Sequence, residues 1–284
     1  MNGIHINWTA PFALRHGGEY FIEDFELLTT MLSALKWKEK NGRIKLCADD
    51  TALEYYRTAG ILGIYDETER LEVDGDIDPQ MFWAAGKLFA LRKQKAPTAM
   101  IDTDFIVWEE ILFDRLGECT VIHFEELYPD VYPPRSSFSM REDYEWPELD
   151  WELPACNTAF VVIKSQELLD YYTESAIEFM KNAQNTGDPL RYMVFAEQRL
   201  INMCAARLGI EVRAFSHLAR LFAHGEKCFT HTWGMKQQMR DTPWLRRDFC
   251  LRCDARIRRE YPQYAEDVYK RQPYGGSVAC AEVL

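Results

Sequence analysis

Two aspartates separated by one residue, Asp102 and Asp104, directly follow an apolar run in the sequence. Carboxylates at this spacing suit a hard divalent cation, because Mg²⁺ and Mn²⁺ bind one or two protein carboxylates and complete their coordination with phosphate oxygens and water. Aspartate is also favoured in turns, where its side chain accepts backbone hydrogen bonds. The pair therefore predicts a site for a metal and a diphosphate or, alternatively, a solvated turn.

The same pair admits a second enzymatic interpretation, the aspartyl-phosphate nucleophile of D-x-D-x-[TV] phosphatases. Ile106 stands at the fifth position of that pattern and has no hydroxyl group. The pair also lies about a hundred residues into the chain, whereas the phosphatase nucleophile comes near the start. The sequence therefore disfavours the phosphatase interpretation.

The segment from Phe229 to Lys236 contains the other residue types that a metal and diphosphate site needs. His231 is a candidate third ligand for Mn²⁺, Gly234 permits close approach of a backbone, and Lys236 supplies a positive charge for phosphate. A single histidine is more often packed or exposed than bound to a metal. His231 is therefore a candidate ligand only in combination with the two aspartates.

Three further polar residues lie between these segments. Asn157 stands at the start of an apolar run, and Glu197 and Gln198 fall within a helical pattern. The side chains of Glu197 and Gln198 can hydrogen-bond sugar hydroxyls, but capping or surface exposure explains either residue equally well.

The elements that must position these side chains are visible as apolar periodicity. Strands are expected over residues 3–8, 43–48, 97–101 and 157–163, and helices over 19–39, 51–59, 78–92, 165–181 and 191–208, with a turn at Pro11. This alternation predicts an α/β fold with a mainly parallel sheet flanked by helices. Ligands bind beyond the carboxyl ends of strands in such sheets, which is where Asp102 falls.

Two segments break this pattern. Residues 128–154 are expected to form a long loop, in which Trp146 and Trp151 either contact a ligand through their ring faces or anchor the loop. Residues 268–284 show no period, so we expect a non-native or disordered tail after a domain that spans residues 1–267.

The composition is that of a folded protein. The chain has 284 residues, 47% of them hydrophobic, which is enough to bury a large core in a single domain. Its formal net charge of −12 repels phosphate backbones and argues against nucleic acid as a partner. No run of about 18 apolar residues occurs, so no transmembrane segment is expected. Nothing in the sequence indicates an oligomeric state.

The eight cysteines lie mostly in apolar runs, which predicts reduced core thiols and a cytoplasmic protein. Cys250 and Cys253 form a lone C-x-x-C pair. A structural zinc site needs four ligands, and no second pair follows at a usable spacing.

Four short motifs occur in the order found in one enzyme family: Asp102-Thr103-Asp104, Asn157-Thr158-Ala159, Glu197-Gln198-Arg199-Leu200-Ile201-Asn202 and His231-Thr232-Trp233-Gly234. The sequence resembles the GT-A fold glycosyltransferases, particularly the family-eight type that includes lipopolysaccharide galactosyltransferases and glycogenin. The opening Ile4-His5-Ile6-Asn7-Trp8 is similar to the first strand of capsular-polysaccharide-type transferases. The chain departs from the family pattern at Ala159, Glu197 and Arg199, and Lys236 comes one residue early.

The resemblance implies a Rossmann-like GT-A domain and a metal-dependent transferase. Such an enzyme moves a sugar from a nucleotide-sugar donor, with a UDP-sugar expected, to a glycan or other hydroxyl acceptor. It implies Asp102, Asp104 and His231 as ligands of Mn²⁺ or Mg²⁺, Thr9, Ala10, Lys87, Thr103, Gly234 and Lys236 around the donor, and Asn157, Glu197 and Gln198 as catalytic residues. The altered triplet at 197–199 favours an alternative, a non-catalytic GT-A-like scaffold that binds a sugar or nucleotide.

Overall fold

A seven-stranded sheet forms the centre of the protein in the computed structural model, which describes residues 1–184 and 187–264. In chain order its strands are β1 (Gly3–Asn7), β2 (Ile44–Ala48), β3 (Glu67–Arg70), β4 (Thr98–Ile101), β6 (Cys119–Val121), β9 (Phe160–Ile163) and β10 (Val212–Ala214). Their order across the sheet is β10-β6-β9-β4-β1-β2-β3. Only β9 runs antiparallel to its described neighbours, β4 and β6.

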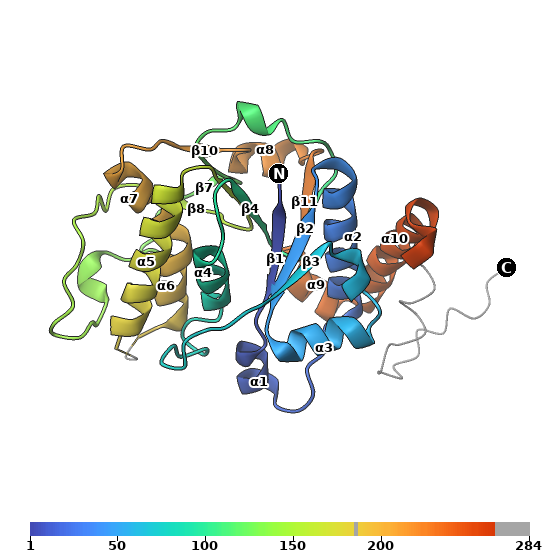
Figure 1. Cartoon of the computed structure of the whole chain (residues 1–284), viewed down its shortest axis with the longest axis horizontal. Helices are drawn as coiled ribbons and strands as arrows, with labels where there is room; N and C mark the ends of the chain where they lie inside the picture. Colours follow the sequence, from blue (N-terminus) through green and yellow to red (C-terminus); the bar gives the residue numbers. More distant parts are fainter. Residues whose placement is uncertain (185–186, 265–284) are drawn as a thin grey trace.

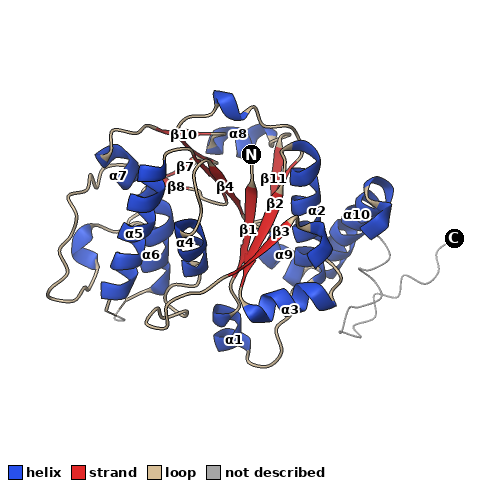
Figure 2. Cartoon of the chain, in the orientation of Figure 1, coloured by secondary structure: helices blue, strands red, loops and turns tan. Residues whose placement is uncertain are grey.

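Two small ribbons and a set of helices complete the fold (Figures 1 and 2). The ribbons pair β5 (Phe105–Val107) with β11 (Phe229–His231) and β7 (Phe124–Glu125) with β8 (Ala155–Cys156). The α-helices are α1 (Ala10–His16), α2 (Asp24–Lys40), α3 (Asp50–Thr58), α4 (Ala85–Arg92), α5 (Gln166–Asn182), α6 (Pro189–Val194), α7 (Leu200–Arg207), α8 (Leu218–His224), α9 (Met235–Asp241) and α10 (Pro243–Glu260). A π-helical turn, η4 (Phe195–Arg199), joins α6 to α7, and single 3₁₀ turns occupy η1 (Leu62–Ile64), η2 (Phe113–Arg115), η3 (Arg135–Ser137) and η5 (Pro262–Tyr264).

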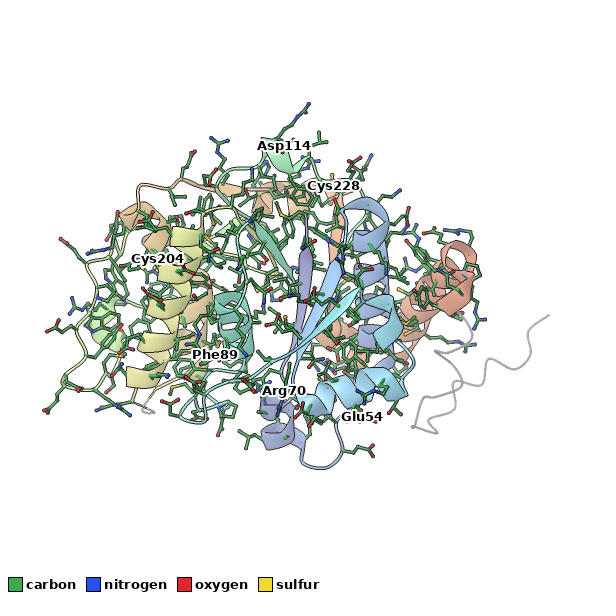
Figure 3. The ribbon with its side chains drawn as sticks, in the orientation of Figure 1. Glu54, Arg70, Phe89, Asp114, Cys204 and Cys228 are labelled. Carbon is green, nitrogen blue, oxygen red and sulfur yellow. The ribbon has the colours of Figure 1, made fainter. Side chains whose placement is uncertain are left out.

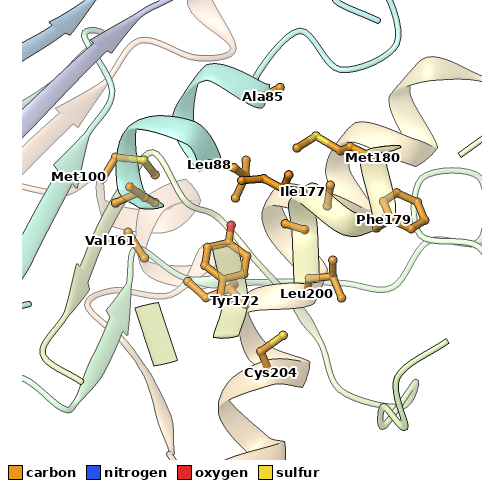
Figure 4. Close-up of a cluster of buried hydrophobic side chains, with 14 of the residues drawn as sticks. Ala85, Leu88, Met100, Val161, Tyr172, Ile177, Phe179, Met180, Leu200 and Cys204 are labelled. Carbon is orange, nitrogen blue, oxygen red and sulfur yellow. The ribbon is translucent and has the colours of Figure 1, made fainter. Parts of the chain in front are cut away.

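Helices cover both faces of the sheet. On one face α4, α5 and α7 pack over β4 and β9, and Figure 4 shows Leu88, Tyr172 and Leu200 converging there. On the other face α2, α3 and α10 bury a second core, in which the Trp37 ring contacts Phe160. The expected fold class, an α/β domain with a mainly parallel sheet flanked by helices, is confirmed.

The C-terminal helices return to the start of α2. Arg240 of α9 pairs with Glu23 at 2.6 Å, and Arg246 of α10 pairs with Asp24 at 2.7 Å. The apolar side of α10 meets the α2 core through Cys253 and Ile257. These contacts fix α9 beside the carboxyl end of the sheet.

Several elements differ from the sequence expectations. The helix expected over residues 78–92 begins only at Ala85, because residues 78–84 form turns. Pro11 lies in the first turn of α1, where its missing N–H needs no partner, so the expected turn there is wrong. Strands β3, β6 and β10 were not expected. The four residues of β3 are all polar, and β6 and β10 are only three residues long, so none of them has a periodic apolar signal.

The long loop between β7 and β8 is anchored by its tryptophans. Trp151 stacks on Phe195 with ring centroids 5.1 Å apart, and Trp146 packs on Phe179 at 5.9 Å. Arg199 covers the Trp151 ring and donates to the Pro133 carbonyl at 2.9 Å. Both tryptophans therefore hold the loop to the core, as the second of the two interpretations expected.

The seven cysteines within the described residues are free thiols. Cys204 on α7 and Cys228 beside β11 lie in well separated parts of the molecule (Figure 3). Within the described ranges no helix has the length and apolar character needed to cross a membrane. The expected tail at 268–284 lies outside the described residues.

Candidate functional site

A cavity of about 990 Å³ lies beyond the carboxyl ends of β1 and β4. Parallel neighbours such as these end at the same edge of a sheet, which is where open α/β sheets bind ligands. Its walls come from α1, the start of α2, the start of α4, the turn after β4, the η4 turn and α9. Nine of the twelve predicted site residues line it, so the topology brings most of the motifs together.

Three charged groups form an ion triad in this cavity: Asp102, Lys87 and Glu197. Lys87 on α4 places its Nζ 2.7 Å from Asp102 Oδ1 and 2.6 Å from Glu197 Oε1. The Thr158 hydroxyl also donates to Glu197 Oε1 at 2.9 Å. The π-helical turn η4 carries Glu197 into this position, and turns of this kind recur at functional sites.

Burial sets the electrostatics of the triad. It raises the pKa of Asp102 to about 6, and the ammonium group of Lys87 opposes that shift. Burial also disfavours the charged form of Lys87, but the carboxylates of Asp102 and Glu197 outweigh it and raise the pKa of that lysine. Lys87 is therefore a permanent cation between two acidic groups.

Asp104 lies beside a second set of partners. Its Oδ2 is 3.0 Å from Lys236 Nζ and 3.7 Å from His231 Nε2. The antiparallel pairing of β11 with β5 sets His231 opposite Phe105 and so next to Asp104. Lys236, on the first turn of α9, also approaches Glu26 Oε1 at 3.5 Å.

The protonation states here suit metal ligands. Burial lowers the pKa of His231 to about 4, so the imidazole is neutral near pH 7. Burial opposes ionisation of Asp104, but Lys236 and His231 outweigh it and lower the pKa of the carboxyl group. A neutral imidazole beside an ionised carboxylate is the form in which both bind a cation.

The donor set fits a hard divalent cation in part. The 3.7 Å between Asp104 Oδ2 and His231 Nε2 can be bridged by one cation with bonds of about 2.0 to 2.3 Å. Asp102 instead faces Lys87. Among the described residues no group of three or more His, Cys, Asp or Glu side chains is already arranged to hold a metal.

The predicted catalytic residues line the cavity and have partners that the sequence did not indicate. Asn157 donates from Nδ2 to Glu125 Oε1 at 3.1 Å. Gln198 accepts a hydrogen bond from the Tyr132 hydroxyl at 2.7 Å. These contacts fix both amides at the wall of the cavity. Thr103 also lines it, between the two aspartates.

Three predicted residues lie outside the cavity lining. Thr9 donates from its backbone N–H and its hydroxyl to Asp49 Oδ2, at 2.6 and 2.9 Å, and Ala10 begins α1. Gly234 precedes α9 without reaching the cavity. The neighbours that do line it are Asn7, Trp8, Pro11 and Trp233.

Sequence reasoning missed several lining residues. Asn7 follows the rule that strand ends meet ligands, so its position at the end of β1 was a usable signal. Glu26 gave none, because an acidic residue in the first turn of a helix is normal for the helix dipole. Trp233 stands at the mouth with 61% of its surface exposed.

The chain matches the model of a family of unknown function, DUF6734, over residues 1–271. The chain belongs to this family. No curated protein matches it. Among solved structures, this DUF6734 protein overlays on mouse xyloside xylosyltransferase 1 in its apo form, with a TM-score of 0.38 and 11% identity over 76% of this chain and 85% of that one. An overlay this loose assigns no activity.

Proposed function

We propose that this protein is a glycosyltransferase of the GT-A type, which moves a sugar from a nucleotide-sugar donor to a hydroxyl acceptor. The observation that carries the proposal is the placement of His231 beside Asp104, with Lys236 adjacent, in the cavity that also holds Asp102. These residues come from distant parts of the chain and from separate motifs. Their order in the sequence is the one that suggested the family.

Each charged residue has a role in this reaction. Asp104 and His231, with Asp102, would hold a divalent cation, which would supply charge stabilisation for a departing diphosphate. Lys236 contacts Asp104 and Lys87 contacts Asp102, so each aspartate has a cation beside it that can attract phosphate oxygens.

The amide residues face the transferred sugar. Gln198 is held through its oxygen by Tyr132, which leaves its NH₂ group free to donate to a sugar hydroxyl. Glu197 already accepts from Lys87 and Thr158 through Oε1. We therefore assign Glu197 chiefly to the positioning of Lys87, and Gln198 and Asn157 to contacts with the sugar or acceptor.

The test measures nucleotide release from a panel of UDP- and GDP-sugars with Mn²⁺. Loss of metal binding removes several kcal/mol of charge stabilisation, so Asp102→Asn and Asp104→Asn are each expected to lower release by more than about 100-fold. Asp74→Asn is the control, because Asp74 pairs with Lys181 away from the cavity. Failure of every nucleotide to bind would overturn the proposal.

A second candidate is a binding scaffold without turnover. Arg199 stands where the family pattern has an aspartate, and its guanidinium points to the loop carbonyls of Pro133 and Trp151 instead of the cavity. Tight binding of a nucleotide with no release from any donor sugar would favour this candidate. The phosphatase interpretation predicts Mg²⁺-dependent cleavage of p-nitrophenyl phosphate, and we expect none.

A further inference from the structure

Each aspartate of the pair is held by a lysine from a different part of the chain. Lys87 Nζ lies 2.7 Å from Asp102 Oδ1, and Lys236 Nζ lies 3.0 Å from Asp104 Oδ2. An ammonium group is a compact charge on a flexible stem, without the fixed fork of arginine. A lysine can therefore exchange one oxygen partner for another while the backbone stays in place.

Each lysine also contacts a second carboxylate besides its aspartate. Lys87 contacts Glu197 at 2.6 Å, and Lys236 contacts Glu26 at 3.5 Å. If a lysine side chain moves away from its aspartate, its ammonium group therefore still has a glutamate as counter-charge. The cavity runs past both lysines, so phosphate oxygens within it come within reach of both.

The charges in the cavity disfavour the binding of a divalent cation alone or of a diphosphate alone. With the histidines left out, the cavity lining has a net formal charge of −1. It contains five carboxylates, those of Glu23, Glu26, Asp102, Asp104 and Glu197, and four cationic side chains, those of Arg15, Lys87, Lys236 and Arg240. Glu26 is shared, because Arg240 also approaches it at 3.4 Å. A diphosphate without a cation meets this negative charge and two engaged lysines. A cation without a diphosphate must compete with the ammonium groups for the carboxylates.

We propose that Lys87 and Lys236 are exchangeable counter-cations, which hold the aspartates until metal and diphosphate arrive together. The cation then takes the carboxylate oxygens, and the released ammonium groups turn to the phosphate oxygens. This inference rests on the proposed function, because it takes a nucleoside diphosphate as the ligand. The exchange makes the binding of metal and of diphosphate mutually dependent. Thermodynamic linkage requires that each ligand change the affinity of the other by the same factor.

The test uses the full chain and binding measurements without turnover. Calorimetry gives the dissociation constants of Mn²⁺ and UDP, each alone and each with the other at saturation. In the wild type we expect each ligand to tighten the other by about 10- to 100-fold. In Lys236→Met we expect Mn²⁺ alone to bind more tightly than in the wild type, UDP with Mn²⁺ to bind more weakly, and the coupling to fall.

Two further variants control for structure. Lys181→Met removes a lysine whose side chain is 31% exposed, against 30% for Lys236, and which pairs with Asp74 at 2.6 Å outside the cavity. All binding constants of this variant are expected to equal those of the wild type. Lys236→Gln keeps a hydrogen-bond donor for Asp104 without the charge, and is expected to shift affinities in the same directions as Lys236→Met.

The outcomes separate the two proposals. If the wild type binds both ligands, but neither Lys236 variant binds Mn²⁺ alone more tightly, the exchange is refuted and the proposed function stands. If the wild type binds neither Mn²⁺ nor UDP, the proposed function fails and the exchange fails with it. Tighter metal binding with reduced coupling in both variants supports the exchange.

Discussion

Replacement of Lys87 by methionine removes the cation of the ion triad and keeps the length of the apolar stem. The side chains of Lys87, Asp102 and Glu197 are only 20%, 24% and 7% exposed. Removal of one partner from a buried ion pair costs about 3 to 5 kcal/mol, because the remaining charges stay buried without compensation. At about 2 °C per kcal/mol for a chain of this size, the melting temperature should fall by about 6 to 10 °C.

The protein contains a matched control for this variant. Lys45 is also 20% exposed and also contacts two carboxylates, those of Glu67 and Glu69, both at 3.0 Å. Glu67 is 54% exposed, so water compensates it once the lysine is gone. Glu69 is 26% exposed and keeps a hydrogen bond from Gln94 Nε2 at 3.2 Å. Lys45→Met should therefore cost no more than about 1 kcal/mol.

Thermal and urea unfolding, followed by circular dichroism, provide the comparison. Adding Glu197→Gln to Lys87→Met should recover part of the loss, because it removes one of the two uncompensated charges. The reasoning would be refuted if Lys87→Met lost no more stability than Lys45→Met. It would also be refuted if the double variant were less stable than Lys87→Met alone.

Two other predictions concern Gly86, which lines the cavity, and His5, which does not. Gly86→Ala on α4 would place a Cβ 2.8 Å from Trp8 Cβ; overpacking of about 1 to 3 kcal/mol should outweigh the gain of about 1 kcal/mol in helix propensity. Urea unfolding measures the free energy of unfolding of this variant, with Gly63→Ala as the control because a Cβ at Gly63 meets nothing within 4 Å. An increase in the stability of Gly86→Ala would contradict the prediction. Burial lowers the pKa of His5 from 6.5 to about 3, so its contribution to stability is complete above pH 6.5 and is lost as the pH falls toward 3. About 2 kcal/mol should disappear between pH 7 and pH 5, and His5→Gln should show a smaller loss over that interval.

The position of the Asp102-Thr103-Asp104 turn was predictable from local sequence. An apolar run long enough for a strand ends at Asp102, and the rule for open α/β sheets places that end at a ligand site. Strands β1, β2, β4 and β9 and the helices from α2 to α7 followed from the same periodicity, whereas β3, β6, β10 and the C-terminal helices did not. These patterns depend only on residues that are close in sequence, so they can be recognised without knowledge of the tertiary structure.

The partners of these residues were not predictable in the same way. His231 reaches Asp104 only because the three-residue strand β11 pairs with β5, and so short a strand has no periodic signature. Glu197 reaches Lys87 through a π-helical turn, which the helical pattern over residues 191–208 did not reveal. The engagement of Thr9 by Asp49 likewise depends on the parallel pairing of β1 with β2.

The return of the C-terminal helices to α2 bears on how the protein is made. Arg240 and Glu23 are 217 positions apart, and Arg246 and Asp24 are 222 apart. A chain emerging from the ribosome can pair β1 with β2 early, since domains fold as their residues become available. It cannot complete the wall that contains Lys236 until α9 has been synthesised. Until then one wall of the cavity is missing and the acidic start of α2 lacks its arginine partners.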